Sequence, residues 1–149
     1  SLKTLAVSDN QLSGTIPSAF FDPLVHTEFI SLDGNYLLGT VPEGVNVLSR
    51  LITIDLSRNM FTGTIPSFAL SSGLAIARFN ENRFSDSAFA CNRPNARLYV
   101  RDNDLRTFPL PADCLHSPRI IYGQSNRIEG VFNLSILQNT EEAYFQDNL

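Results

Sequence analysis

Residues 51–66 read LITIDLSRNMFTGTIP, and this stretch contains the pattern that decides the fold. Ile54 and Leu56 are apolar residues two positions apart, which is the spacing of a short β-strand with one buried face. Asn59 follows three positions later, and its amide side chain can both donate to and accept from the backbone of a bend. Phe61 supplies a further apolar residue two positions after the asparagine. The stretch therefore predicts a strand, an asparagine-supported turn and a second buried position.

The same pattern recurs along the chain at intervals of 21 to 25 residues. The asparagines that mark it are Asn10, Asn35, Asn59, Asn82, Asn103, Asn126 and Asn148. Five residues before them stand Leu5, Ile30, Ile54, Ala77, Leu98, Ile121 and Ala143, and three before stand Val7, Leu32, Leu56, Phe79, Val100, Gly123 and Phe145. Two residues after them stand Leu12, Leu37, Phe61, Phe84, Leu105, Ile128 and Leu149. Because one coil cannot bury its own apolar edge, the pattern predicts a curved solenoid of stacked coils, with a parallel sheet on one side and a ladder of asparagines.

Three segments extend the pattern in a more specific way. Residues 12–17 (LSGTIP), 37–42 (LLGTVP) and 61–66 (FTGTIP), together with the spacing L-x-x-L-x-L-x-x-N-x-L, resemble the plant-type leucine-rich repeat. The resemblance covers essentially the whole chain. It implies an α/β-type solenoid: a horseshoe of about six to seven coils, with the parallel sheet on the concave face and mostly irregular or 3-10 outer segments. Such repeats occur in plant receptor-like ectodomains, polygalacturonase-inhibiting proteins and some protist surface proteins, which implies an extracellular or cell-surface location.

The pattern also departs from that family in two respects. Asp86 and Thr107 occupy the glycine slot in the fourth and fifth coils, and Gly130 returns in the sixth without a following proline, so the later coils are expected to cross their outer side differently. Stacked coils without capping segments expose apolar core at both ends. Residues 1–149 are therefore expected to form one leucine-rich repeat segment, an internal fragment of a longer protein without its caps.

Strand positions that alternate with the buried ones are expected to line the concave face. Tyr99, Tyr122 and Tyr144 fall in one such column in successive coils, where parallel strands about 4.8 Å apart would place their rings side by side. The predicted ligand-binding patch of aromatic faces, amides and guanidinium groups consists of Arg78, Tyr99, Arg101, Tyr122, Gln124, Tyr144 and Gln146. The first half of this face carries small or acidic residues, so a ligand is expected toward the C-terminal half. The alternative is that the rings only stabilise the sheet.

Two features of the outer side suggest a secreted protein. Cys91 and Cys114 are 23 residues apart, about one repeat, so adjacent coils could place them within disulfide distance. The alternative is two buried free thiols. Asn133 begins the sequence Asn-Leu-Ser, a glycosylation acceptor on the side away from the concave sheet. Both features, if formed, indicate an oxidising extracellular compartment.

Several functions are excluded by composition. A net charge of -4 with a single lysine gives no basic footprint for nucleic acid, and no apolar run is long enough to insert into a membrane. His26 and His116 lie about four repeats apart, and no metal, phosphate or dinucleotide motif is present, so we expect no catalytic residue, cofactor or metal.

The sequence predicts a non-catalytic module that binds a protein, peptide or glycan. The alternative is a structural building block of a coat, wall or filament, packing against like chains.

Overall fold

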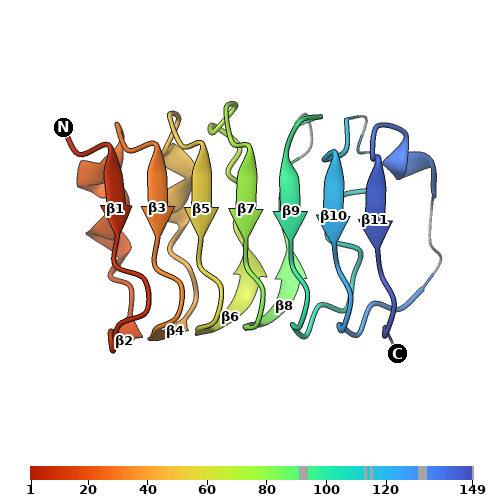
Figure 1. Cartoon of the computed structure of the whole chain (residues 1–149), viewed down its shortest axis with the longest axis horizontal. Coiled ribbons are helices and arrows are strands. Elements are labelled where there is room, and N and C mark those ends of the chain that lie inside the picture. Colours follow the sequence, from red (N-terminus) through yellow and green to blue (C-terminus); the bar gives the residue numbers. More distant parts are fainter. Residues whose placement is uncertain (91–93, 113, 115, 131–133, 149) are drawn as a thin grey trace.

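Seven short parallel strands stand side by side in the computed structural model and form one continuous sheet (Figure 1). In order along the sheet they are β1 (Thr4–Ala6), β3 (Phe29–Ser31), β5 (Thr53–Asp55), β7 (Ile76–Arg78), β9 (Arg97–Tyr99), β10 (Ile120–Tyr122) and β11 (Glu142–Tyr144). The structure describes the chain except residues 91–93, 113, 115, 131–133 and 149. Each coil contributes one strand, so the predicted solenoid and its parallel sheet are confirmed.

The register of this sheet follows the asparagine spacing. Ile54 pairs with Ile30 on one side and with Ala77 on the other, and Leu98 continues the same row. These residues all stand five positions before an asparagine, and they are almost completely buried. Counting from the asparagines therefore predicts the register correctly across the sheet.

The asparagines form the predicted ladder through their side-chain amides. Asn59 donates from Nδ2 to the carbonyl oxygens of Leu56 and Ser57 in its own coil and of Leu32 in the preceding coil, at 3.0 to 3.3 Å. Its Oδ1 accepts the backbone N–H of Leu37 at 3.0 Å. The same four contacts recur at Asn82. Each such amide thus bonds buried backbone groups in two neighbouring coils.

A second, four-stranded parallel sheet runs along the side of the first four coils. Its strands are β2 (Ser13–Thr15), β4 (Tyr36–Gly39), β6 (Met60–Ile65) and β8 (Arg83–Ser87). Gly39 and Gly63 have positive φ, and a Cβ at either would lie about 3 Å from a threonine methyl of the preceding coil, so the close stacking requires glycine. At Asp86, in the glycine slot, the pairing of β6 with β8 shifts register. The second sheet was not predicted, and the described parts of the later coils add no strand to it.

The outer side of the solenoid carries short 3-10 segments, as expected for this kind of repeat. They are η1 (Ser18–Leu24), η2 (Glu43–Val47) and η3 (Leu134–Leu137). η1 and η2 each follow a proline in extended conformation, which sets the direction of the chain into the turn. None of the helices in the described residues has the length and apolar character needed to cross a bilayer.

Phenylalanines fill the middle of the stack. Phe61 and Phe84 stack with ring centroids 6.2 Å apart, and Phe79 meets Phe84 edge to face at 5.9 Å. Phe68 packs against Phe79 on the outer side. All four side chains are fully buried. Because buried aromatic rings contribute large apolar areas, this cluster anchors the central coils to one another.

Candidate functional site

The seven-stranded sheet presents one face to solvent, which we call the open face. Side chains alternate along each strand, so Arg97 and Tyr99 of β9 lie on the open face while Leu98 between them is completely buried. The strand register places the side chains of neighbouring coils in rows across this face. All seven residues of the predicted patch lie in two of these rows.

The first row contains the tyrosine ladder. Tyr99, Tyr122 and Tyr144 occupy matching positions in β9, β10 and β11. The rings of Tyr99 and Tyr122 are 5.1 Å apart and nearly parallel, at 5°, and those of Tyr122 and Tyr144 are 4.9 Å apart at 15°. Tyr122 therefore has a tyrosine against each of its ring faces. The stack itself therefore takes up most of the ring faces that were expected to be available.

Charged side chains close both ends of the ladder. The guanidinium carbon of Arg78 lies 5.4 Å from the ring centroid of Tyr99, a cation–π distance, and Arg78 Nη1 lies 3.5 Å from Asp55 Oδ2. At the other end the hydroxyl of Tyr144 donates to Glu142 Oε2 at 3.4 Å. Burial within the stack, and then the charge of Glu142, raise the pKa of the Tyr122 hydroxyl above its ordinary value. The hydroxyls of Tyr122 and Tyr144 thus both interact with the Glu142 carboxylate.

The second row contains the amides and the second arginine of the predicted patch. Arg101 pairs with Glu81 at 2.9 Å and with Asp102 at 3.0 Å, so its charge is compensated. Gln146 is exposed, whereas Gln124 is half-buried and its Oε1 is shielded from solvent without a hydrogen-bond donor in the described residues. This row offers amide donors beside the tyrosine hydroxyls.

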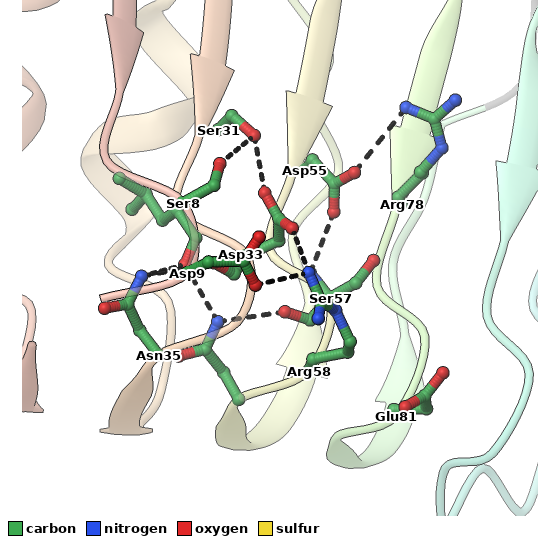
Figure 2. A network of polar contacts seen from close by, with 12 residues as sticks. Ser8, Asp9, Ser31, Asp33, Asn35, Asp55, Ser57, Arg58, Arg78 and Glu81 are labelled. Atoms are coloured by element: carbon green, nitrogen blue, oxygen red, sulfur yellow. Dashed lines mark hydrogen bonds and ion pairs between the residues drawn. The ribbon is translucent and has the colours of Figure 1, made fainter. Parts of the chain in front are cut away.

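A polar network occupies the first three coils of the open face (Figure 2). Arg58 Nη2 donates to Asp33 Oδ2 at 2.7 Å and to Asp9 Oδ1 at 2.8 Å. Ser31 donates to Asp33 Oδ1 at 2.7 Å, and its hydroxyl lies 2.9 Å from that of Ser8. Burial raises the pKa of Asp33, but the hydrogen bonds from Ser8, Ser31 and Arg58 outweigh it and hold the pKa below its ordinary value. Both carboxylates are therefore compensated by Arg58, and Asp33 is also hydrogen-bonded to Ser31.

Gly34 makes room for the ion pair between Asp9 and Arg58, which joins residues two coils apart. It lies in the coil between Asp9 and Arg58, and a Cβ at this position would fall within 3.1 Å of Arg58 Nη2 and collide with the Asp9 carboxylate. Its φ of 65° is also in the left-handed region. The ion pair between Asp9 and Arg58 crosses one coil only because that coil has glycine there.

A third row of the open face was missed at the sequence level. It stands six residues before each asparagine and consists of Thr4, Phe29, Thr53, Ile76, Arg97, Ile120 and Glu142. Arg97 is exposed and makes no ion pair with the described residues, in contrast to Arg78 and Arg101. Carrying the strand alternation one step further toward the N-terminus would have revealed this row.

The remaining predicted sites were expected on the outer side. Cys91 and Asn133 fall outside the described residues, so the disulfide to Cys114 and the glycosylation stay predictions. Cys114 itself is buried. Within the ranges that the structure describes, no three histidine, cysteine or acidic side chains gather in a way that could hold a metal ion.

Comparison with protein families agrees with this architecture. The family described as Leucine Rich Repeat matches residues 1–22 and 50–70. Pollen receptor-like kinase 2 of Arabidopsis thaliana is 29% identical over 119 residues, an alignment that covers 76% of this chain and 17% of the kinase. The chain therefore spans a small part of this relative's length.

Two solved structures share the fold over nearly the whole chain. The structure described as PEPR1-AtPEP1 matches 98% of this chain and 21% of its own, with 27% identity and a TM-score of 0.81. The plant peptide hormone receptor RGFR1 in complex with RGF2 matches 96% of this chain and 24% of its own, with 22% identity and a TM-score of 0.82. At 22% identity, the similarity to RGFR1 establishes a shared fold and nothing more.

Proposed function

We propose that this chain, a segment of plant-type leucine-rich repeats, is a non-catalytic recognition module that binds an extended peptide across the open face of its sheet. The observation that carries the proposal is the uninterrupted stack of Tyr99, Tyr122 and Tyr144. In this proposal the open face is the concave face of the solenoid and the tyrosine ladder is the centre of the binding surface.

The ladder has the properties of a protein-binding hot spot. Tyrosine and arginine are enriched at such sites because they combine a large contact area with a polar group. Stacking fixes the three rings, and the cation–π contact with Arg78 fixes the end of the row. Because the side chains are already ordered, little conformational entropy is lost on binding.

The chemistry of the ladder favours a peptide over a glycan. A sugar that packs on an aromatic side chain uses the ring face, and both faces of Tyr122 are occupied by its neighbours. The hydroxyls remain, and a tyrosine hydroxyl is protonated at neutral pH and can both donate and accept a hydrogen bond. Backbone carbonyl groups of an extended peptide are the complementary acceptors.

The related proteins support the same reading. The solved structure that is 27% identical is described as PEPR1 with AtPEP1, and the related kinase is a receptor-like protein. We therefore place this segment at the cell surface or outside the cell. The predicted disulfide and glycosylation belong to the same proposal.

Binding to a phage-displayed library of random dodecapeptides tests the proposal. The wild-type chain is expected to enrich related peptides, and the triple variant Tyr99→Ala, Tyr122→Ala, Tyr144→Ala is expected to bind them at least about 30-fold more weakly. The matching triple Tyr→Phe variant keeps the rings but removes the hydroxyls, and we expect it to lose most of the same affinity. Affinities are measured by titration calorimetry with the selected peptides.

Tyr36→Ala is the matched control, because Tyr36 is 56% exposed on β4 of the second sheet, away from the open face. It is expected to bind as the wild type does. Circular dichroism reports whether each variant is folded. Failure of the wild type to enrich any peptide, or undiminished binding by a folded triple alanine variant, would overturn the proposal.

A further inference from the structure

We infer that a cavity between the fourth, fifth and sixth coils binds a small, neutral, largely apolar molecule that carries a hydrogen-bond donor, such as a phenolic hydroxyl. The cavity has a volume of about 350 Å³ and lies where the second sheet ends. Its lining comes from Ser87 of β8, from residues 107–112 of the fifth coil and from Ile136 of η3. None of these residues belongs to the peptide-binding proposal, so the two proposals are tested separately.

Two prolines explain why a cavity forms at this place. Pro109 and Pro111 have no backbone N–H to donate, so the fifth coil cannot pair with the C-terminal end of β8 as a further strand. The hydroxyl of Ser87 instead donates to the carbonyl oxygen of Pro109 at 3.0 Å. The two coils are therefore joined here through a side chain rather than a backbone ladder, which leaves room between them.

The lining of the cavity is mostly apolar and uncharged. Leu110 and Ile136 are almost fully buried, and Phe108 is half-buried. None of the described residues that line the cavity carries a charge. An ionised ligand loses hydration here without gaining an opposite charge, so the site favours a neutral molecule. The volume lies at the lower end of the range of about 300–1,000 Å³ found for small-molecule sites, which suits a single substituted ring.

Two hydroxyl groups in the lining determine the polarity of the ligand. Thr107 Oγ1 donates to Asp86 Oδ1 at 2.8 Å, and Ser87 Oγ donates to the Pro109 carbonyl. Because a hydroxyl has one hydrogen, both groups can offer a ligand only their lone pairs. Ser87 Oγ also accepts the backbone N–H of Phe89 at 3.3 Å, so Thr107 has the greater free acceptor capacity. The ligand is therefore the donor, and Thr107 is its main partner.

Asp86 fixes the orientation of the Thr107 hydroxyl. Its Oδ1 also accepts the backbone N–H of Ser87 at 2.8 Å, so two bonds hold the carboxylate in place. Asp86 occupies the glycine slot of the fourth coil, at which the pairing of β6 with β8 shifts register. The departure from the repeat pattern thus places a hydroxyl that can only accept at the edge of an apolar cavity.

The test measures the binding of four small probes by NMR titration, with the methyl groups of Ile136 as reporters. Phenol has a ring and a donor, anisole has a ring and an acceptor, toluene has neither polar group, and benzoate is charged. Phenol is expected to bind with a Kd of about 1 mM. Its affinity is expected to exceed that of anisole or toluene by about 3-fold to 10-fold. Benzoate is expected to leave the Ile136 signals unshifted.

Substitutions in the lining connect this binding to the cavity. Thr107→Val removes the hydroxyl with little change of shape and is expected to bind phenol no more tightly than toluene, whereas Thr107→Ser keeps the hydroxyl and the preference. Ala112→Trp fills the cavity from an exposed position and is expected to abolish binding of every probe. Ala69→Trp is the matched control, because Ala69 is also exposed but does not line the cavity, and it is expected to bind as the wild type does.

Several results would refute the inference. Equal affinities of the wild type for phenol and toluene, or a preference for phenol that survives in Thr107→Val, would exclude the acceptor role of Thr107. Binding of benzoate as tight as that of phenol would exclude a site for neutral molecules. Undiminished binding by Ala112→Trp would show that the probes bind elsewhere. Circular dichroism reports whether each variant is folded, and if Ala112→Trp is not, the comparison of Thr107→Val with Thr107→Ser decides.

Discussion

Gly123 occupies a core position that is filled by a larger side chain in the other coils, and Phe145 of the next coil takes up the space. A Cβ at Gly123 would fall 2.7 Å from Cδ1 of the Phe145 ring. The φ of Gly123 is not in the left-handed region, so packing rather than backbone conformation requires the glycine. Phe145 also packs against Phe108, with ring centroids 4.9 Å apart. The small residue and the large one form a matched pair across two coils.

Gly123→Ala is expected to destabilise the protein. The added methyl group must displace the Phe145 ring, and overpacking of this kind lowers the free energy of unfolding by about 1–3 kcal/mol. The measurement is urea unfolding followed by circular dichroism. Gly73→Ala is the control, because a Cβ there meets nothing within 4 Å and its φ is not positive. The double variant Gly123→Ala, Phe145→Leu should regain part of the loss, and equal stability of Gly123→Ala and wild type would contradict the packing account.

This pair also marks a limit of sequence-based prediction. Counting from the asparagines identifies Gly123 as a weak core position, but it does not indicate that Phe145 compensates for it. Spacing along the chain determines which residues face the core, whereas the fit between Gly123 and Phe145 depends on the direction of one ring.

At the scale of strands, the prediction succeeded where backbone periodicity decides the outcome. The alternation in β9 and β10 places Leu98 and Ile121 in the core and the tyrosines on the open face. The second sheet was missed because the segment around Gly39 served only as evidence of the family resemblance and was not interpreted as a strand that pairs with its neighbours. Contacts of long side chains could not be predicted either. Arg58 reaches Asp9 only because of its rotamer and the glycine between them.

Asp33→Asn tests the polar network that links the first three coils. The pKa of Asp33 is lower in the folded chain than its ordinary value, so its stabilising contribution is present above about pH 4 and is lost as the pH falls through the folded pKa. The variant is expected to be about 1 kcal/mol less stable than wild type at neutral pH. The difference should shrink in acid. Urea unfolding at a series of pH values measures it.

Asp22→Asn is the control for this experiment, since Asp22 is exposed on η1 and makes no side-chain hydrogen bond or ion pair with the described residues. Its stability should match wild type at each pH. A constant difference between Asp33→Asn and wild type from neutral pH into acid would show that the Asp33 charge is not what stabilises the network.

At the scale of the whole molecule, the asparagine ladder makes the solenoid a chain of nearest-neighbour contacts. Asn82 has four hydrogen bonds, two to its own coil and two to the coil before, and it is almost fully buried. Asn10 donates only within its own coil and is exposed. We therefore expect the asparagine side chain to contribute more to the free energy of unfolding at position 82 than at position 10.

Asn82→Ala is expected to cost about 1–3 kcal/mol, because it leaves the buried Phe61 N–H without its acceptor and leaves the Leu56 carbonyl with Asn59 as its remaining side-chain donor. Asn10→Ala should cost less than about 1 kcal/mol. Both are measured by urea unfolding of the purified variants. Equal costs at the two positions would mean that the bonds between coils add nothing beyond the local turn.

The glycine beneath the Asp9–Arg58 ion pair has a consequence for how such a protein can evolve. Repeat proteins change length by duplication or deletion of whole repeats, and the asparagine ladder tolerates such events because its bonds between neighbouring coils are alike. The Asp9–Arg58 pair spans two coil steps, and its geometry is destroyed when a coil is gained or lost between them. Gain or loss of a coil within the first three therefore removes this ion pair.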